Sequence, residues 1–163
     1  MILNLQMAGL LLDCYWENDT IQDQKDLKIV EVGKDDEHAA YIFACNNTQI
    51  KNGGAPNVDK LNMEELTAYE WNTNELWFDG KGNSREMFSE MMSTIHSLIL
   101  ELSKIKRQCE FEIVASIDNG SREIAASYTI RFYVIRNGSH YINNQVESLN
   151  EFHQPVLVYN FST

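Results

Sequence analysis

Histidine and cysteine are the residue types of this chain best suited to bind a metal ion or to act as nucleophiles. Zinc sites space such ligands closely, as in Cys-x-x-Cys or His-x-x-x-His. Neither spacing occurs, so we expect no metal site, buried thiols in a reducing compartment, and histidines mainly in turns or on the surface. The residues concerned are Cys14, Cys45, Cys109, His38, His96, His140 and His153.

Motifs for phosphate binding, acyl transfer and calcium binding are also missing from the sequence. The segment Gly80-Lys81-Gly82 is too short for a phosphate-binding loop and lacks the required Ser or Thr. No Gly-x-Ser-x-Gly segment occurs. The aspartates Asp19, Asp23 and Asp26 have the wrong spacing for a calcium loop. We therefore predict no catalytic residue, no cofactor and no enzymatic activity, with an enzyme of unrecognised type as the remaining alternative.

The chain is strongly acidic, with 24 Asp plus Glu against 13 Lys plus Arg in 163 residues and a formal net charge of −11. Residues 13–37 carry nine acids and three lysines, and residues 59–90 carry eight acids and three basic residues. Residues 91–137 are nearly balanced, with five acids and six basic residues. Because phosphate backbones are bound through Lys and Arg, we expect no nucleic-acid partner. The acidic N-terminal half favours a basic protein partner.

The first twelve residues are apolar enough to raise the question of a signal peptide. They lack a positively charged start, since Lys25 is the first basic residue, and no small-residue cleavage site precedes Asp13. No segment approaches the ~20 apolar residues of a membrane span. We therefore expect a cytoplasmic protein that does not bind membranes, and we interpret residues 2–16 as a core strand.

Apolar positions predict the elements of the N-terminal half. Residues 27–32 form a short strand, and residues 39–45 are apolar at consecutive positions, as in a strand buried on both faces. Asn62 followed by Glu65 is a capping box, which predicts a short helix over about 62–72.

A short strand over 75–79 precedes the strongest local pattern, which predicts a helix over about 84–107. Asn83 and Glu86 form a second capping box at its start. Apolar residues then recur at helical spacing, so one side of the helix must be buried. This apolar stripe comprises Met87, Phe88, Met91, Met92, Ile95, Leu98, Ile99, Leu102 and Ile105.

The two Asn-Gly-Ser segments of the chain lie between runs of apolar residues, a pattern typical of two-residue hairpin turns. Across the first turn, Phe111 would face Tyr128. Across the second, Val134 would face Tyr141. In both predicted registers apolar residues face apolar residues. A one-residue slip would move every side chain to the other face, so this pairing specifies which face is buried. That face comprises Phe111, Ile113, Ala115, Ile117, Ile124, Ala126, Tyr128, Ile130, Phe132, Val134 and Tyr141.

Together these elements predict one α+β domain over residues 1–163, a mostly antiparallel sheet with the long helix packed on one face. A last strand over 156–161 follows Pro155 and suits a sheet edge, where a missing amide is tolerated. The other face of the sheet is mixed in character. We expect it to be covered by the shorter helix or to form a contact surface, and it carries Glu112, Val114, Arg131, Tyr133 and Ile135.

Acidic residues of the N-terminal half lie near two aromatic residues in the sequence. Aromatic side chains with charged neighbours are common at protein interfaces, and a field of one sign orients an oppositely charged partner. A core position would suit the two aromatic residues equally well. The partner-binding residues predicted in this way are Tyr15, Trp16, Asp19, Asp23, Asp26, Asp35, Asp36 and Glu37.

A small, acidic, single-domain α+β chain without a catalytic motif resembles the immunity proteins of bacterial toxin systems, in particular those of contact-dependent growth inhibition. The resemblance implies tight binding to a cognate toxin, often a basic nuclease, by covering its active site or substrate-binding surface. The acidic loops would then pair with Lys and Arg residues of the toxin or stand in for nucleic-acid phosphates.

Other classes of binding protein fit the same composition. A secretion chaperone would use the methionine-rich helix side, with Met87, Met91 and Met92, as a pliable contact surface, although core packing explains these residues more simply. An inhibitor that mimics phosphate could act on a nucleic-acid enzyme of a host or phage. A homodimer is compatible with each of these interpretations.

Overall fold

The computed structural model describes residues 1–13, 27–33, 38–44, 57–80, 83–143 and 145–163. Its strands are β1 (Ile2–Leu3), β2 (Ile29–Val32), β3 (Ala40–Phe43), β4 (Glu75–Asp79), β5 (Glu110–Asp118), β6 (Ser127–Val134) and β7 (Val156–Ser162). Its helices are α1 (Leu5–Asp13), α3 (Met63–Thr73), α4 (Ser84–Leu102) and α5 (Val146–Leu149), with a short 3₁₀ helix η2 (Val58–Lys60).

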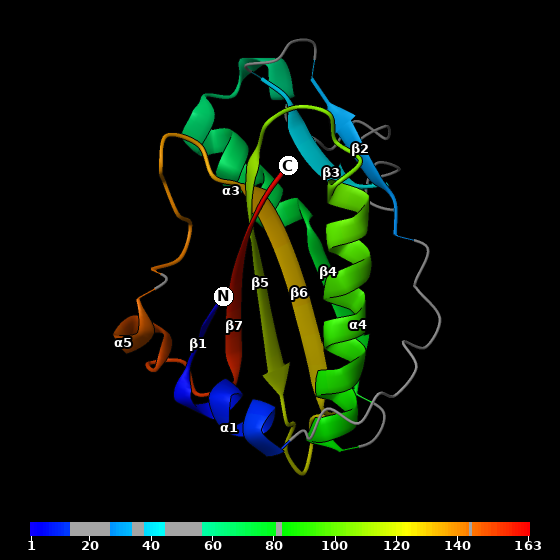
Figure 1. The fold of residues 1–163 in the computed structure, drawn as a ribbon, viewed down its shortest axis with the longest axis vertical. Helices are drawn as coiled ribbons and strands as arrows, with labels where there is room; N and C mark the ends of the chain where they lie inside the picture. The colour runs from blue at the N-terminus through cyan, green and yellow to red at the C-terminus, as the bar shows by residue number, and fades with distance from the viewer. Residues whose placement is uncertain (14–26, 34–37, 45–56, 81–82, 144) are drawn as a thin grey trace.

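Five strands form one antiparallel sheet in the order β1-β7-β5-β6-β4, and β2 and β3 form a separate hairpin. Helix α4 lies across one face of the large sheet (Figure 1), which we call the inner face; the opposite one is the outer face. The predicted α+β fold, with a mostly antiparallel sheet and a long helix on one face, is confirmed. Among the described residues, no helix has the length and apolar character needed to cross a membrane.

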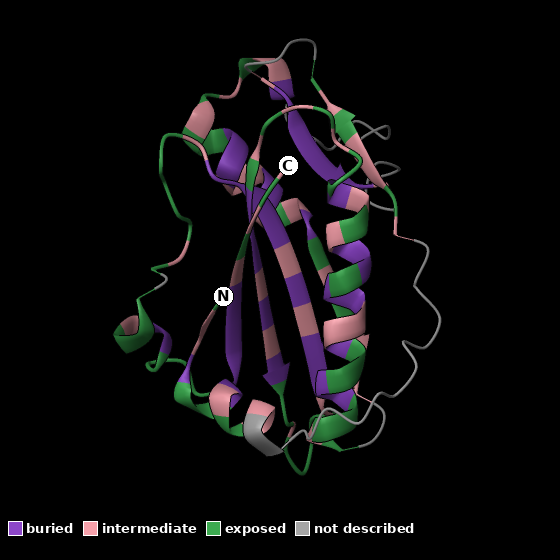
Figure 2. Cartoon of the chain, in the orientation of Figure 1, coloured by how far each residue is buried: buried purple, intermediate pink, exposed green. Residues whose placement is uncertain are grey.

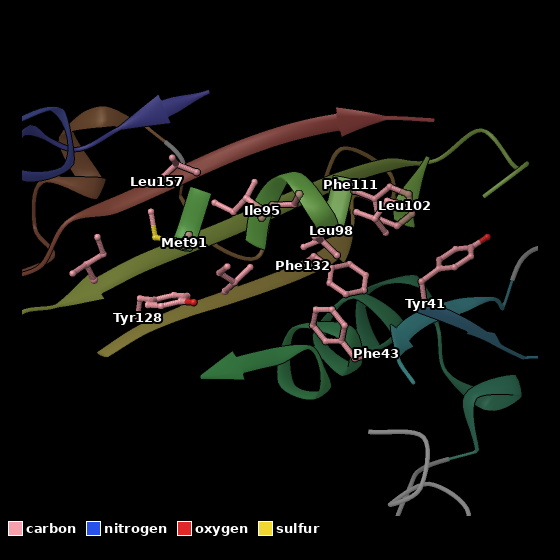
Figure 3. Packing of buried hydrophobic residues seen from close by; sticks show 14 of the residues in the cluster. Tyr41, Phe43, Met91, Ile95, Leu98, Leu102, Phe111, Tyr128, Phe132 and Leu157 are labelled. Carbon is pink, nitrogen blue, oxygen red and sulfur yellow. The ribbon is translucent and has the colours of Figure 1, made fainter. Parts of the chain in front are cut away.

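The hydrophobic core lies between α4 and the inner face, where the buried parts of the strands and of α4 meet (Figure 2). Leu98 and Leu102 of α4 belong to the same buried cluster as Phe111 of β5 and Phe132 of β6 (Figure 3). Phe43 of β3 closes one end of this cluster and meets the ring of Phe132 edge-on, with ring centroids 4.9 Å apart. The β2-β3 hairpin is therefore held to the main sheet by aromatic packing.

The methionines of α4 belong to this core. Met87 and Met91 are fully buried, and Met92 is half-buried against the same cluster. Flexible thioether side chains fill irregular spaces well, which suits them to this position. The methionine surface on which the secretion-chaperone alternative depended is therefore core packing.

The register of β5 and β6 differs from the predicted one. Phe111 pairs with Val134 instead of Tyr128, and Tyr128 pairs with Ile117. Because the partner of each residue shifts by an even number of positions, every side chain keeps its face. The predicted buried residues on these two strands are confirmed, namely Phe111, Ile113, Ala115, Ile117, Tyr128, Ile130, Phe132 and Val134.

The predicted two-residue turn after β5 is wrong because residues 119–126 fold back on themselves. The Asp118 carboxylate accepts a hydrogen bond from the Gly120 N–H (2.8 Å), and the Ser121 hydroxyl accepts one from the Ile124 N–H (3.2 Å). Such local bonds compete with the strand ladder. Ile124 is consequently 64% exposed, so its predicted burial is wrong. Ala126 lies outside the strands as well, but it is half-buried and still packs against the core.

The second Asn-Gly segment does form the predicted two-residue turn. Asn137 and Gly138 have φ values of 54° and 69°, and the residues on either side of them form an isolated bridge. The chain then leaves the sheet, so the predicted pair between Val134 and Tyr141 is wrong. Tyr141 lies on the outer face and is 45% exposed instead of buried.

The predicted strand over 2–16 is replaced by the two-residue β1 and by α1, and residues 14–16 lie outside the described ranges. Asn4 starts the helix, because its side-chain Oδ1 accepts the Met7 N–H (2.9 Å). The same atom accepts the Val156 N–H (3.0 Å) and so ties the helix to β7. The following residues lack the β-branched side chains that favour strands, and Met7 is fully buried in the core.

Both predicted capping boxes are present, and α3 and α4 begin within one residue of their predicted starts. Helix α4 ends at Leu102, not at residue 107. There the Ile105 N–H donates to the Leu102 carbonyl (3.0 Å), a tighter turn that ends the helix. Ile105 still packs against the core, which is why the apolar stripe extends past the helix.

The short strands agree with their predictions, and all four residues of β3 are buried, as expected for a strand covered on both faces. Strand β7 begins after Pro155 as predicted, but it does not lie at the sheet edge. It pairs with β5 along its length and with β1 at Leu157 and Val158. The proline is accommodated because it precedes the strand, where its carbonyl accepts the Ile117 N–H (3.1 Å).

Candidate functional site

All eight predicted partner-binding residues lie outside the described residues. The same holds for two of the three cysteines. Their charges and spacing remain properties of the sequence, and the candidate site of the described residues is formed by other parts of the chain. The residues concerned are Tyr15, Trp16, Asp19, Asp23, Asp26, Asp35, Asp36, Glu37, Cys14 and Cys45.

A groove of about 360 Å³ crosses the outer face of the sheet, and we call it the outer-face groove. Its floor comes from β5 and β6, one wall from α3 and β4, and the other wall from the segment that leads into β7. The lining residues are Val114, Ser116, Asp118, Ser127, Tyr128, Thr129 and Arg131 of the floor, Trp71, Glu75 and Trp77 of the first wall, and Ile142, Phe152, Gln154 and Val156 of the second.

Strand alternation explains why these side chains meet. Successive side chains of a strand point to opposite faces, so the apolar inner positions of β4, β5 and β6 leave the alternate positions outside. The register sets Trp77 beside Thr129 and Thr129 beside Ser116, in one row across three strands. The hydroxyls of Ser116 and Thr129 lie 2.9 Å apart and hydrogen-bond to each other. The floor is therefore lined by hydroxyls that already have a partner.

Arg131 organises the wall formed by α3 and β4. Its guanidinium donates to the Glu75 carboxylate (2.6 Å) and lies 4.8 Å from the centroid of the Trp71 ring. A cation over an indole face is attracted by the quadrupole of the ring, whose electrostatic potential is negative above the face. The two contacts together fix the orientation of Trp71 and Glu75 at the groove.

Trp77 and Phe152 give the groove its exposed aromatic surface. Trp77 is 56% exposed at the centre of β4, and Phe152 is 42% exposed in the opposite wall. Large aromatic side chains are enriched at binding surfaces because each buries a large area with few rotatable bonds to restrict. These two residues are the apolar part of the groove most accessible to a partner.

Aromatic stacking closes one end of the outer face. The rings of Trp71 and Tyr141 are stacked with centroids 4.6 Å apart, and Trp71 meets Tyr133 edge-on at 5.8 Å. This accounts for part of the mixed outer face, because α3 covers Tyr133 of β6. The predicted cover by the shorter helix is therefore confirmed for one part of that face, and the groove leaves another part open.

The buried carboxylate of Glu112 positions the aromatic side chains at this end of the outer face. Glu112 is fully buried and accepts hydrogen bonds from the Tyr133 hydroxyl and, at 2.8 Å, from the partly exposed ring of His140. The Tyr133 hydroxyl in turn accepts the Tyr141 N–H (2.9 Å). Burial, followed by the neighbouring Glu112 carboxylate, raises the pKa of Tyr133 well above its ordinary value. Tyr133 therefore stays a neutral donor to Glu112 at physiological pH.

Helix α3 is held in place by a second buried carboxylate, Glu70. The Arg136 guanidinium donates to both oxygens of Glu70, at 2.7 Å and 2.8 Å. The backbone N–H groups of Tyr41 and Val134 donate to the same carboxylate at 2.8 Å each. Burial raises the pKa of Glu70, whereas Arg136 and these two N–H groups act against that rise. Four donors directed at one carboxylate fix α3 against β3 and β6.

The second wall of the groove depends on Asn4. Its side-chain amide donates to the carbonyls of Leu149 (3.2 Å) and Gln154 (2.8 Å), and Asn4 is almost fully buried. Leu149 packs with Val156 and Val158 on the outer side of β7. The segment that carries Phe152 and Gln154 is thereby held close to the sheet.

A family model matches residues 2–163, nearly the whole chain. The chain belongs to the uncharacterized protein PM0498 family. No curated protein and no solved structure matches it. The description of the family states no activity, so the chemistry of the groove must carry the functional argument.

Within the described part of the chain, no group of three or more His, Cys, Asp or Glu side chains could hold a metal ion. The thiol of Cys109 is half-buried and lies 3.9 Å from the Tyr41 hydroxyl, and burial raises its pKa. A raised pKa reduces the thiolate fraction and with it the nucleophilicity of the residue. The groove itself combines exposed aromatic surface with fixed charges.

Val114 and Arg131 were predicted to lie on the outer face, whereas Trp71, Trp77 and Phe152 were not predicted as site residues. A signal for Trp77 was present, because Leu76 and Phe78 on either side mark the inner face of a short strand. A tryptophan on the other face, between Glu75 and Asp79, is an exposed aromatic residue at a polar surface. No comparable pattern indicates Phe152, since it lies in an irregular segment positioned by contacts distant in sequence.

Proposed function

We propose that this chain is a cytoplasmic binding protein that neutralises a basic protein partner, as an immunity protein inhibits its cognate toxin. The outer-face groove is the observation that carries the proposal. It combines exposed aromatic surface with carboxylates on a sheet whose two sides are held by buried hydrogen bonds. A rigid site of this kind binds without first losing conformational entropy.

The groove has the composition of a binding hot spot. Hot spots concentrate in aromatic residues and arginine, surrounded by polar groups that exclude water. Trp77 and Phe152 would contribute the aromatic area, and the Glu75 and Asp118 carboxylates lie at the same groove. A lysine or arginine side chain of a partner could lay its alkyl part on the Trp77 ring and direct its charge to a carboxylate.

The charge of the whole chain supports a basic partner. Its formal net charge is −11, and most of the excess lies in residues 13–37 and 59–90. Such a field raises the association rate with an oppositely charged protein and orients its approach. Binding by the groove and steering by the acidic segments are separate contributions to one interaction.

Inhibition follows if the bound surface is the one that the partner needs. A basic nuclease binds its substrate through Lys and Arg, so an acidic protein on that surface excludes the nucleic acid. An inhibitor of a host or phage nucleic-acid enzyme would use the same chemistry and differ only in its target.

A paired capture and growth experiment tests the proposal. Tagged wild-type chain and the Trp77→Ser variant are used to capture partners from a lysate of the source cells. Each captured protein is then expressed alone in a test strain and together with the chain. We expect one basic protein that stops growth alone, and growth restored by wild type. Loss of a hot-spot tryptophan should weaken binding by about 2 kcal/mol or more.

Leu100→Ser is the matched control. Leu100 is 40% exposed on α4, on the other side of the sheet from the groove, so this variant removes exposed apolar surface of a similar kind. It should bind and protect like wild type. The proposal fails if the captured protein is not basic, if it is harmless when expressed alone, or if both variants bind equally well.

A further inference from the structure

The edge strand β4 carries a feature that the groove does not explain. We propose that the outer edge of β4 accepts an extended segment of the basic partner as an additional strand of the sheet. In that segment, Lys or Arg side chains would lie on the same face as Trp77 and on either side of it. This inference rests on the proposed function and names the kind of segment that the site takes.

Strand β4 is the last strand of the five-stranded sheet. It pairs with β6 through all five of its residues, and no strand within the described ranges pairs with its other edge (Figure 1). An edge strand presents unpaired N–H and C=O groups, and these are a template for a strand from another chain. Main-chain hydrogen bonds of this kind provide affinity, and alternate side chains provide specificity.

The strand is rigid enough to act as such a template. Its inner side chains pack on the core, where Phe78 stacks on Tyr128 with ring centroids 4.6 Å apart. At its start, the fully buried Asn74 donates to the carbonyls of Tyr41 (2.7 Å) and Phe132 (3.1 Å). At its end, the Gly80 N–H donates to the Ala126 carbonyl (2.7 Å). A partner strand would therefore meet a preformed backbone.

The outer face of β4 selects for positive charge. Glu75, Trp77 and Asp79 occupy its three exposed positions, so the aromatic side chain lies between two carboxylates, of which Glu75 also pairs with Arg131 of β6. Opposite charges on directly facing residues of paired strands are favourable, and like charges are unfavourable. A segment with basic residues at positions i and i+4 and an apolar residue at i+2, all on one face, would match these three side chains.

The same pattern disfavours a second copy of this chain. An antiparallel pair of β4 strands centred on Trp77 would set Glu75 of each copy opposite Asp79 of the other. Like charges would then face each other at both ends of the pair. Acidic residues alone could serve only to prevent such self-association. They do not account for a tryptophan that is 56% exposed between them, at the centre of the strand.

Nuclear magnetic resonance with a synthetic peptide tests the inference without the natural partner. In the peptide, lysines flank a valine on one face of the extended chain, with threonines between. We expect it to shift the amide signals of β4 and to slow their hydrogen exchange. A peptide with glutamate in place of lysine should not bind. A peptide in which every amide between the two lysines is N-methylated keeps the charge but cannot donate main-chain hydrogen bonds to β4, so it should not protect β4.

Two charge-reversal variants distinguish peptide binding at the β4 edge from nonspecific electrostatic attraction to the acidic chain. Asp79→Lys should weaken peptide binding about fivefold, the scale of one cross-strand charge pair. Glu147→Lys makes the same change of charge at an exposed position on α5 and should leave binding unchanged. Equal binding of the N-methylated peptide, equal effects of the two variants, or the absence of protection at β4 would each overturn the inference.

The outcome is independent of the test of the proposed function. If the peptide does not protect β4 while partner capture still depends on Trp77, only the edge inference is wrong. If the peptide binds at β4 but no basic, growth-inhibiting partner is captured, the proposed function is wrong instead.

Discussion

At the scale of single residues, the structure contains two ion pairs with opposite environments. Glu70 and Arg136 are both buried, with side-chain exposures of 0% and 8%. Glu75 and Arg131 are partly exposed, with side-chain exposures of 42% and 28%. A buried pair is costly to break because one charge remains without compensation, whereas an exposed pair contributes little. The two ion pairs therefore have similar N···O distances but contribute very differently to stability.

This contrast predicts the effect of two matched substitutions. Glu70→Gln should lower the free energy of unfolding by about 3–5 kcal/mol, because Arg136 is left buried without a counter-charge. Glu75→Gln removes the same charge at the exposed pair and should cost less than about 1 kcal/mol. Urea unfolding followed by tryptophan fluorescence measures both. Similar losses in the two variants would show that the Glu70 pair does not hold α3 as described.

At the scale of secondary-structure elements, local sequence patterns predicted the individual helices and strands better than they predicted how the strands pair. The capping boxes and apolar stripes placed α3 and α4 because both signals lie within one turn or one face of a helix. The side of β5 and β6 that faces the core was also predictable, since strand alternation does not depend on the partner residue. The pairing between β5 and β6 was not predictable from the turn motif alone, because Ser121 and Asp118 form local hydrogen bonds that lengthen the loop.

The N-terminal element depends on contacts distant in sequence, which local sequence patterns do not reveal. An apolar run after Met1 fits either a strand or a helix, and periodicity alone does not separate them. The side chain of Asn4 decides, through bonds to Met7 and to residues more than 140 positions away. The second wall of the groove depends on the same contacts. For this reason Phe152 could not be recognised as a site residue from the sequence.

Asn4→Ala should therefore destabilise the protein more than the loss of an ordinary helix cap would. The loss of a cap costs about 1 kcal/mol, and each buried group left without a partner costs about 1–3 kcal/mol more. We expect a total loss near 3 kcal/mol or above in the free energy of unfolding. Asn83→Ala, at the exposed capping box of α4, is the control and should lose only about 1 kcal/mol. Equal losses would mean that Asn4 acts as a cap alone.

At the scale of the whole molecule, charge and shape have separate roles in the proposed interaction. The groove and the edge of β4 offer short-range contacts, which set the rate of dissociation. We expect the acidic residues of the N-terminal half to act on a basic partner mainly through the rate of association. This division can be measured, because salt screens the long-range part over about 10 Å at 0.1 M ionic strength and over only about 3 Å at 1 M.

Neutralising the acidic segment tests that division on the captured partner. The variant replaces Asp19, Asp23, Asp26, Asp35 and Asp36 with asparagine and Glu37 with glutamine, which removes six of the 24 acidic side chains. At low salt, stopped-flow mixing should show association slowed by about tenfold, with the dissociation rate unchanged. At high salt the variant and wild type should associate at the same rate, because the field that distinguishes them is screened. A faster dissociation instead, or a difference that persists at high salt, would mean that these carboxylates contact the partner directly and belong to the interface itself.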